Sequence, residues 1–209
     1  MFKRAFWLNL GLCILSVWPT LDLWWALARI NPQWRTAYDY QVFALGIAAT
    51  GAWAFIYLLL TLAVTPVMRL TGFRWPGELR RALGLFAFFY CFLHLALYMA
   101  VGQKWHWDYA WDDAFLEKSR LPGWFAILLL LPLALTSTDA AVRWLGGKNW
   151  KRLHWLIFPA TALAIWHLWW TQANNQNGYR ATRNVVIPFV VLVGLRFVKR
   201  RKRAAALPQ

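Results

Sequence analysis

Three histidines of this 209-residue chain lie inside long apolar stretches, where a polar side chain needs a reason. His154 and His167 lie thirteen positions apart within residues 150–172, and His94 lies within residues 82–101. An imidazole inside a bilayer is costly, usually faces the interior of a helix bundle, and marks a ligand site, a proton relay or an ion path. The plainer alternative is that each imidazole hydrogen-bonds a neighbouring helix.

The composition indicates a membrane protein. Hydrophobic residues make up 60% of the chain, which also has 17 Trp and several uncharged runs long enough to cross a bilayer as helices. The net charge of +15 comes from short basic clusters that flank these runs, rather than from one basic face. Membrane topology explains such clusters better than nucleic-acid binding does, so no nucleic-acid partner is expected.

The apolar runs predict an all-α, polytopic bundle of six transmembrane helices. Residues 1–209 are expected to form a single membrane domain that ends in a short basic cytoplasmic tail. The expected spans are residues 5–28, 42–64, 82–101, 124–141, 153–171 and 185–198. The first is interpreted as a retained helix because it is long and Trp-rich and lacks a clear A-x-A cleavage site. In the second, Ala44, Ala48 and Ala52 recur every four positions, which suits close helix packing.

The basic residues predict the orientation of the bundle. Sixteen of the 23 Lys and Arg residues lie before span one, between spans two and three, between spans four and five, or after span six. Because positive charge is retained on the cytoplasmic side, both termini are expected in the cytoplasm. Most of the acidic residues then fall on or toward the outer side.

This orientation makes spans three and five parallel, so the depths of their histidines can be compared. His94 lies 13 residues beyond Arg81, about 20 Å along its helix, and His167 lies 15 residues beyond Arg152, about 22 Å. The two are therefore level, toward the outer leaflet. His154 is two residues past Arg152, about 3 Å in, near the cytoplasmic end.

Two level histidines on parallel apolar helices suit bis-imidazole ligation of a haem iron. The chain has no C-x-x-C-H motif and its two cysteines, Cys13 and Cys91, stand apart, so any haem is b-type. On an ideal helix His154 and His167 point about 140° apart. Pro159, which lies between them, either re-phases the helix, or the two histidines address different faces.

The histidine pattern and its flanks resemble the ferric reductase-like transmembrane family, which includes ferric reductases and NADPH oxidases. The resemblance rests on paired His on spans three and five, the start RRALGL at residues 80–85 and the start KRLHWLIF at residues 151–158. It covers roughly residues 5–200. It implies that His94 and His167 are axial ligands of an outer haem b, and that His154 serves a second, inner site.

The level partner of His154 on span three would fall near Arg80 or Arg81, where no histidine stands, so the resemblance leaves open one haem or two. It further implies electron transfer across the inner membrane to a periplasmic molybdopterin methionine sulfoxide reductase that repairs oxidised proteins. The chain would then be an electron-transfer subunit rather than the sulfoxide-reducing catalyst. FMN is associated with the family, but no residues here identify its site.

The sequence contains no G-x-G-x-x-G nucleotide loop, so reductant is expected from a separate cytoplasmic flavin reductase or from a membrane quinol. A quinol-oxidising cytochrome b subunit of another respiratory complex is the main alternative. A transporter or scaffold without a redox role is a third interpretation. It is favoured least, because the spans contain almost no acidic relay residues.

Overall fold

A computed structural model describes residues 11–12, 14, 16–21, 25, 37–116, 120–172 and 178–197. These residues form helices joined by short turns, with no strand among them, which confirms the all-α prediction. The elements are α2 (Ala37–Thr71), α3 (Pro76–Leu97), η1 (Tyr98–Gly102), α4 (Trp107–Leu116), α5 (Leu121–Leu135), α6 (Asp139–Leu153), η2 (His154–Leu156), α7 (Ile157–Gln172) and α8 (Gly178–Phe197). Most of the first predicted span and the basic tail lie outside this described part.

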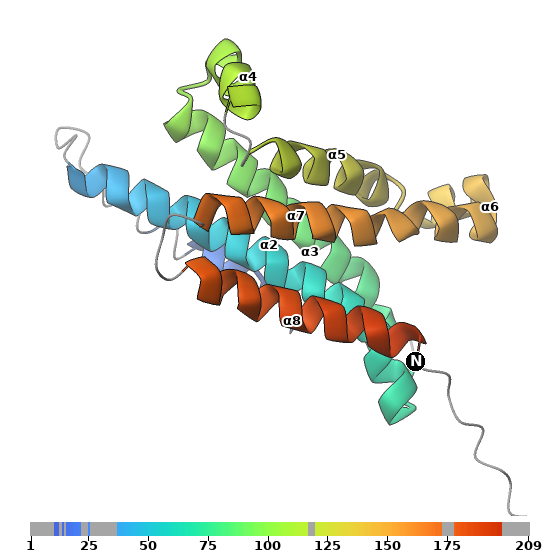
Figure 1. The fold of residues 1–209 in the computed structure, drawn as a ribbon. Coiled ribbons are helices and arrows are strands. Elements are labelled where there is room, and N and C mark those ends of the chain that lie inside the picture. Colours follow the sequence, from blue (N-terminus) through green and yellow to red (C-terminus); the bar gives the residue numbers. More distant parts are fainter. Residues whose placement is uncertain are drawn as a thin grey trace, which may run out of the picture.

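The long helices form one bundle with a short helix at each end (Figure 1). Helix α2 packs mainly on α3, α5 packs on α7, and α8 lies along α2 and α7. Helix α4 lies at one end of the bundle and α6 at the other, and we call these the α4 end and the α6 end. The bundle therefore places residues that are distant in sequence at the same level between the α4 end and the α6 end.

Two helices of the described residues are long and apolar enough to cross a membrane. They cover Ala44–Thr71, with 28 residues, and Pro76–Ala100, with 25. A third span results if α4 and α5, which meet at a bend of 113°, count as one broken span. The chain is thus a multi-pass membrane protein, whereas the count of six spans stays a prediction.

One row of residues on α2 faces the interior. Its members are buried and recur every four positions: Gly46, Thr50, Ala54, Leu58, Leu62 and Pro66. The predicted packing row of Ala44, Ala48 and Ala52 was wrong, because all three are exposed. Both rows have helical spacing, and an apolar membrane helix gives no polar face to tell them apart.

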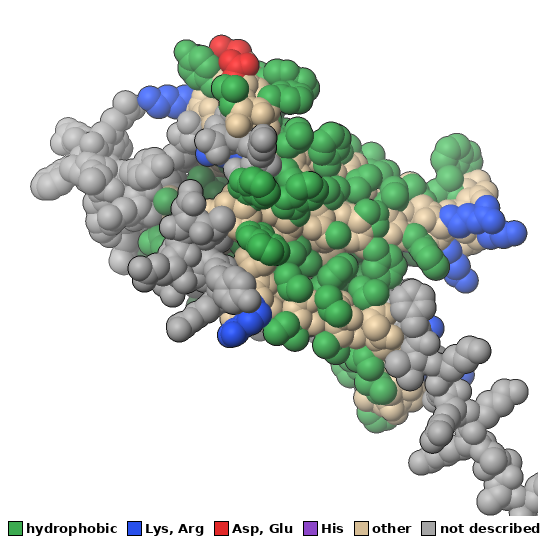
Figure 2. Space-filling model, in the orientation of Figure 1, with side chains coloured by type: hydrophobic (Ala, Val, Ile, Leu, Met, Phe, Trp, Pro, Cys, Tyr) green, Lys and Arg blue, Asp and Glu red, His purple; other side chains and the backbone are tan. Residues whose placement is uncertain are grey.

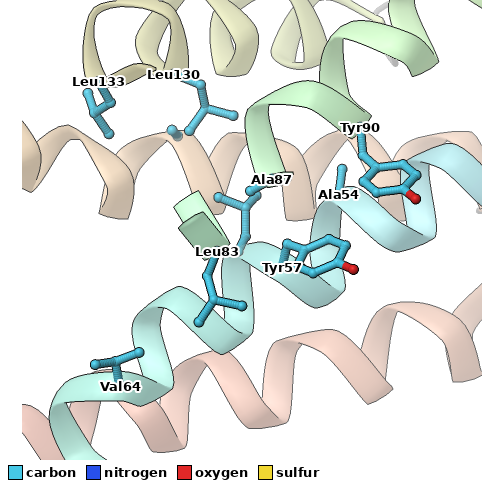
Figure 3. Packing of buried hydrophobic residues seen from close by; sticks show 10 residues of the cluster. Ala54, Tyr57, Val64, Leu83, Ala87, Tyr90, Leu130 and Leu133 are labelled. Atoms are coloured by element: carbon cyan, nitrogen blue, oxygen red, sulfur yellow. The ribbon is translucent and has the colours of Figure 1, made fainter. Parts of the chain in front are cut away.

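Side chains from three helices meet in the core (Figure 3). Tyr57 of α2 and Tyr90 of α3 are buried and stack with ring centroids 5.5 Å apart and planes inclined by 13°. Ser16 joins the N-terminal segment to this pair, because its hydroxyl accepts a 2.7 Å hydrogen bond from Tyr57 and its carbonyl accepts one from Tyr90. Leu130 and Leu133 of α5 extend the same core, in which small alanines let the helices approach.

Helix α5 ends at Leu135 rather than continuing to residue 141 as its predicted span did. The turn that follows is stabilised by hydroxyls, since Thr136 donates to the Pro132 carbonyl at 2.6 Å and Ser137 to the Leu133 carbonyl at 2.6 Å. The Thr138 hydroxyl then accepts from the amide of residue 141 and begins α6. The α6 end therefore has a charged helix where an apolar extension was expected.

The outer surface of the helices is largely apolar (Figure 2). Exposed large side chains include Leu60, Phe89, Phe92, Leu128, Trp166 and Val190, which come from α2, α3, α5, α7 and α8. A water-soluble protein rarely exposes apolar area on so many sides, whereas lipid tails accommodate it. This surface agrees with a multi-pass membrane protein.

Candidate haem-ligand site

The structure brings His94 and His167 together. Their ring centroids lie 6.2 Å apart, and their planes are inclined by 78°. His94 lies in the last turn of α3 and His167 in the second half of α7, both toward the α4 end. The predicted equal depth of the two residues is confirmed, because α-helices advance by a constant rise per residue. Their role as iron ligands stays a prediction.

The protein backbone fixes one of the two imidazoles. Nδ1 of His94 lies 2.8 Å from the carbonyl oxygen of Ile47 on α2. A carbonyl can only accept, so Nδ1 carries the proton and donates it. Nε2 is then the basic nitrogen, which is the tautomer that binds a metal ion through Nε2. The Thr50 hydroxyl donates to the same carbonyl at 2.9 Å.

Each imidazole also rests against a glycine of a neighbouring helix. A Cβ added to Gly51 of α2 would lie 3.1 Å from Nδ1 of His94 and 3.2 Å from Cε1. A Cβ added to Gly123 of α5 would lie 3.1 Å from Nδ1 of His167 and 3.2 Å from Cγ. Neither glycine was identified from the sequence, because helical spacing does not show which residue faces a ring on another helix.

The spacing of the two rings fits a shared metal centre. Because an imidazole nitrogen binds a first-row metal ion at about 2.0 Å, two rings that hold one ion from opposite sides have centroids about 6 Å apart. The centroids of His94 and His167 are separated by 6.2 Å. Among the described residues, no group of three or more His, Cys, Asp or Glu could hold a metal ion. The two imidazoles would each supply one nitrogen to a haem iron, and the described residues form no closed protein cage for a metal ion.

Aromatic residues fill the core next to His94. Tyr90 lies one helical turn from His94 toward the α6 end, and its ring centroid lies 6.2 Å from that of Trp53. Tyr57 stacks on Tyr90 and also contacts Phe86, with centroids 5.6 Å apart. This aromatic cluster excludes water from the α6 side of the histidine pair, which lowers the local dielectric.

His154 lies in a different environment, next to α6. Its ring stacks on Trp150 with centroids 3.8 Å apart, and its Nδ1 lies 3.1 Å from the Trp150 carbonyl. Trp150 in turn donates from Nε1 to the Thr136 carbonyl at 2.9 Å. Trp150 thus hydrogen-bonds a carbonyl at the end of α5, and His154 stacks on Trp150. This structural role of His154 competes with iron ligation.

The break between α6 and α7 falls at His154 itself. Residues His154–Leu156 form a 3₁₀ turn, and Pro159 follows in the first turn of α7. Proline has no amide hydrogen and cannot continue the preceding ladder, which favours such a tightening. A tightened turn therefore lies between His154 and His167, just before the proline.

The other polar residues considered are apart from this site. His106 is exposed, with its ring centroid 5.0 Å from that of Tyr109 on α4. Arg81 forms an ion pair with Asp139 at 2.5 Å, and Arg80 donates to the Thr65 hydroxyl at 3.1 Å. Both arginines therefore have partners within the protein at the α6 end.

A family model described as "Ferric reductase like transmembrane component" matches residues 45–165, which contain His94 and end two residues before His167. The match covers more than half of the chain, and the chain therefore belongs to the ferric reductase-like transmembrane family.

Similar proteins refine this class. A Ralstonia nicotianae protein is 40% identical over 154 residues, which cover 71% of this chain and 68% of that one. A Rhodospirillum rubrum protein is 46% identical over 117 residues, and a Xanthomonas euvesicatoria protein 45% identical over 121 residues. Each is named "Protein-methionine-sulfoxide reductase heme-binding subunit MsrQ". Within the family, the chain belongs to the group of MsrQ proteins, also called YedZ.

The alignments cover 56% of the Rhodospirillum relative and 55% of the Xanthomonas relative, so this chain spans just over half the length of each. No solved structure matches the chain.

Proposed function

We propose that this chain is a b-type haem-binding membrane subunit that passes electrons across the bacterial inner membrane to MsrP, a periplasmic molybdopterin methionine sulfoxide reductase. The observation that carries the proposal is the facing pair of His94 and His167, with ring centroids 6.2 Å apart. Membership of the MsrQ group supplies the class of acceptor. The chain itself carries electrons and does not perform the sulfoxide chemistry.

His94 and His167 would hold the haem iron through one nitrogen each. When bound, haem supplies a one-electron carrier whose potential is set by its axial ligands and surroundings. The Ile47 carbonyl fixes the tautomer of His94 and raises the basicity of its Nε2. A b-type group is proposed because neither cysteine belongs to a C-x-x-C-H motif. We propose one haem, since the imidazole of His154 is hydrogen-bonded to the Trp150 carbonyl and stacks on the Trp150 ring.

The charges at the two ends of the bundle support the proposed orientation. Exposed Arg143, Lys148, Lys151 and Arg152 lie on α6, whereas exposed Asp108 and Asp112 lie on α4. By the positive-inside rule, the α6 end is cytoplasmic and the α4 end periplasmic. The histidine pair then lies toward the periplasmic acceptor. Electrons are supplied by a cytoplasmic flavin reductase or by a membrane quinol, and FMN belongs to this donor side.

Reoxidation of the reduced protein tests the proposal. Haem-loaded protein is reduced in detergent, and its absorbance is followed after addition of MsrP with methionine sulfoxide. The expected result is reoxidation that requires both additions and is lost in a His167→Ala variant. Absence of haem in the wild type, or haem that stays reduced with both additions, overturns the proposal. Ready reduction by quinol with no response to MsrP instead supports a quinol-oxidising cytochrome b.

A further inference from the structure

We infer that Gly51 and Gly123 are positioning residues, each forming the wall behind one imidazole of the histidine pair. The inference rests on the proposed haem function and extends it to two helices that contribute no ligand. Gly51 belongs to α2 and Gly123 to α5, whereas the histidines belong to α3 and α7. Because glycine has no side chain, each imidazole can lie close to the backbone of the neighbouring helix. The two glycines therefore limit where each ring can lie.

A side chain at Gly51 could not easily be accommodated beside His94. A Cβ at Gly51 would stand 3.1 Å from Nδ1 and 3.2 Å from Cε1 of that ring, closer than ordinary van der Waals contact. The ring is anchored on the same helix by the 2.8 Å hydrogen bond from Nδ1 to the Ile47 carbonyl. An added methyl group must therefore push the ring toward His167 or break this bond. Either change alters the direction of Nε2.

The wall behind His167 lies in the first turn of α5. A Cβ at Gly123 would contact Nδ1, Cγ and Cε1 of the ring at 3.1, 3.2 and 3.3 Å. The backbone there is held, because the Gly123 amide donates to the Arg120 carbonyl at 2.9 Å and Pro122 precedes it. Each histidine is thus in close contact with a glycine of a helix other than its own.

Three other glycines of the long helices differ. A Cβ at Gly84 of α3 would meet only Thr61 Cγ2, at an ordinary 3.8 Å, and a Cβ at Gly194 of α8 would meet nothing within 4 Å. At Gly77 the tight neighbour is the flexible end of Met68. Since glycine within a helix is less favourable than alanine, Gly51 and Gly123 need a local reason. Contact with an imidazole provides that reason at both positions.

Four alanine variants test the inference: Gly51→Ala, Gly123→Ala, and the controls Gly84→Ala and Gly194→Ala. Haem content, the electron paramagnetic resonance spectrum of the ferric protein and the midpoint potential are measured for each. Because residues that orient metal ligands strongly affect binding, haem affinity should fall by about tenfold or more in the first two variants. Haem that remains should show an altered spectrum, and both controls should resemble the wild type.

If a glycine variant binds no haem, a double-mutant cycle on the haem-free protein tests the same contact. Gly51→Ala should lower the melting temperature in the wild-type background but not in His94→Ala, where the methyl group has room. The same coupling is expected between Gly123→Ala and His167→Ala. Equal spectra, affinities and potentials across all four haem-loaded variants, or additive effects in both cycles, overturn the inference. A wild-type protein that binds no haem would instead refute the proposed function. The double-mutant cycles on the haem-free protein would still test the contacts between the glycines and the histidines.

Discussion

The backbone positions the central residues of this bundle more than other side chains do. His94 donates to the Ile47 carbonyl, and both imidazoles rest against glycines. A backbone carbonyl in a helix moves little and carries no net charge. It can therefore fix a tautomer without placing a carboxylate in the membrane, where a charged group is expensive. This arrangement suits a redox site that must stay neutral and rigid.

His154 provides a prediction at the residue scale. Its imidazole stacks on Trp150 and hydrogen-bonds the Trp150 carbonyl of α6, so we expect a structural role. His154→Phe should retain one haem per chain with an unchanged spectrum, while the melting temperature falls because the hydrogen bond is lost. Loss of part of the haem, measured by pyridine haemochrome, would instead show that His154 is an iron ligand. His106→Phe, in an exposed turn, is the control.

At the scale of helices, the row of buried residues on α2 is the main packing surface. Leu62 is 0% exposed, whereas Leu60, two positions earlier on the same helix, is 45% exposed. Leu62→Ala should lower the free energy of unfolding by about 2–5 kcal/mol, because it leaves a cavity. Leu60→Ala should cost far less, since lipid or detergent replaces the lost contact. Equal losses in detergent unfolding experiments would mean that this row is misplaced.

The link between α3 and α6 predicts a pH dependence. The guanidinium of Arg81 on α3, 2.5 Å from the carboxylate, lowers the pKa of Asp139 below its usual 3.8. Asp139 is the first residue of α6, beyond the end of α5. A carboxyl whose pKa is lowered on folding adds stability above its unfolded pKa and loses it as the pH falls through the folded value. The melting temperatures of wild type and Asp139→Asn should therefore differ at pH 7 and converge below pH 4.

Both side chains of this pair are substantially exposed, so the difference at pH 7 should be small. Asp108→Asn on α4 is the matched control, because its carboxylate is exposed and forms no ion pair with a described residue. A gap between wild type and Asp139→Asn that persists or widens below pH 4 would contradict the account.

The sequence was sufficient to predict how deep each histidine lies along its helix. It was not sufficient to predict which face of a helix points toward its neighbours. Counting residues from Arg81 and Arg152 placed His94 and His167 level, because the helical rise is constant. The inward row of α2 and the glycines behind the histidines could not be found in the same way. A membrane helix is apolar on all sides, so its periodicity does not mark the buried face, and contacts between helices depend on their relative rotation.

At the scale of the whole molecule, the two ends of the bundle have opposite character. The α4 end exposes aromatic residues with Asp108 and Asp112, and the α6 end exposes basic residues (Figure 2). Trp and Tyr favour the membrane–water interface, and basic residues favour the cytoplasmic side. In the orientation that we propose, the histidine pair lies toward the periplasmic side.

Cysteine labelling tests this orientation. In a background with Cys13→Ala and Cys91→Ala, a single cysteine is introduced by Asp112→Cys on α4 or by Lys148→Cys on α6. A membrane-impermeant maleimide added to intact cells should label the first variant only, and permeabilised cells should label both. If only the α6 variant were labelled in intact cells, the proposed topology would be wrong. The histidine pair would then lie toward the cytoplasm.

The most direct measurement of the central claim is a reduced-minus-oxidised absorbance spectrum with pyridine haemochrome quantification. It compares purified wild type, His94→Ala, His167→Ala and the control His106→Ala, all supplied with haem. The account predicts a low-spin b-type spectrum with one haem per chain in the wild type and the control. The spectrum should be lost in both central variants, because each removes one axial nitrogen. A wild type that remains spectrally blank, or central variants that keep the wild-type spectrum, would contradict the assignment of these residues as haem ligands.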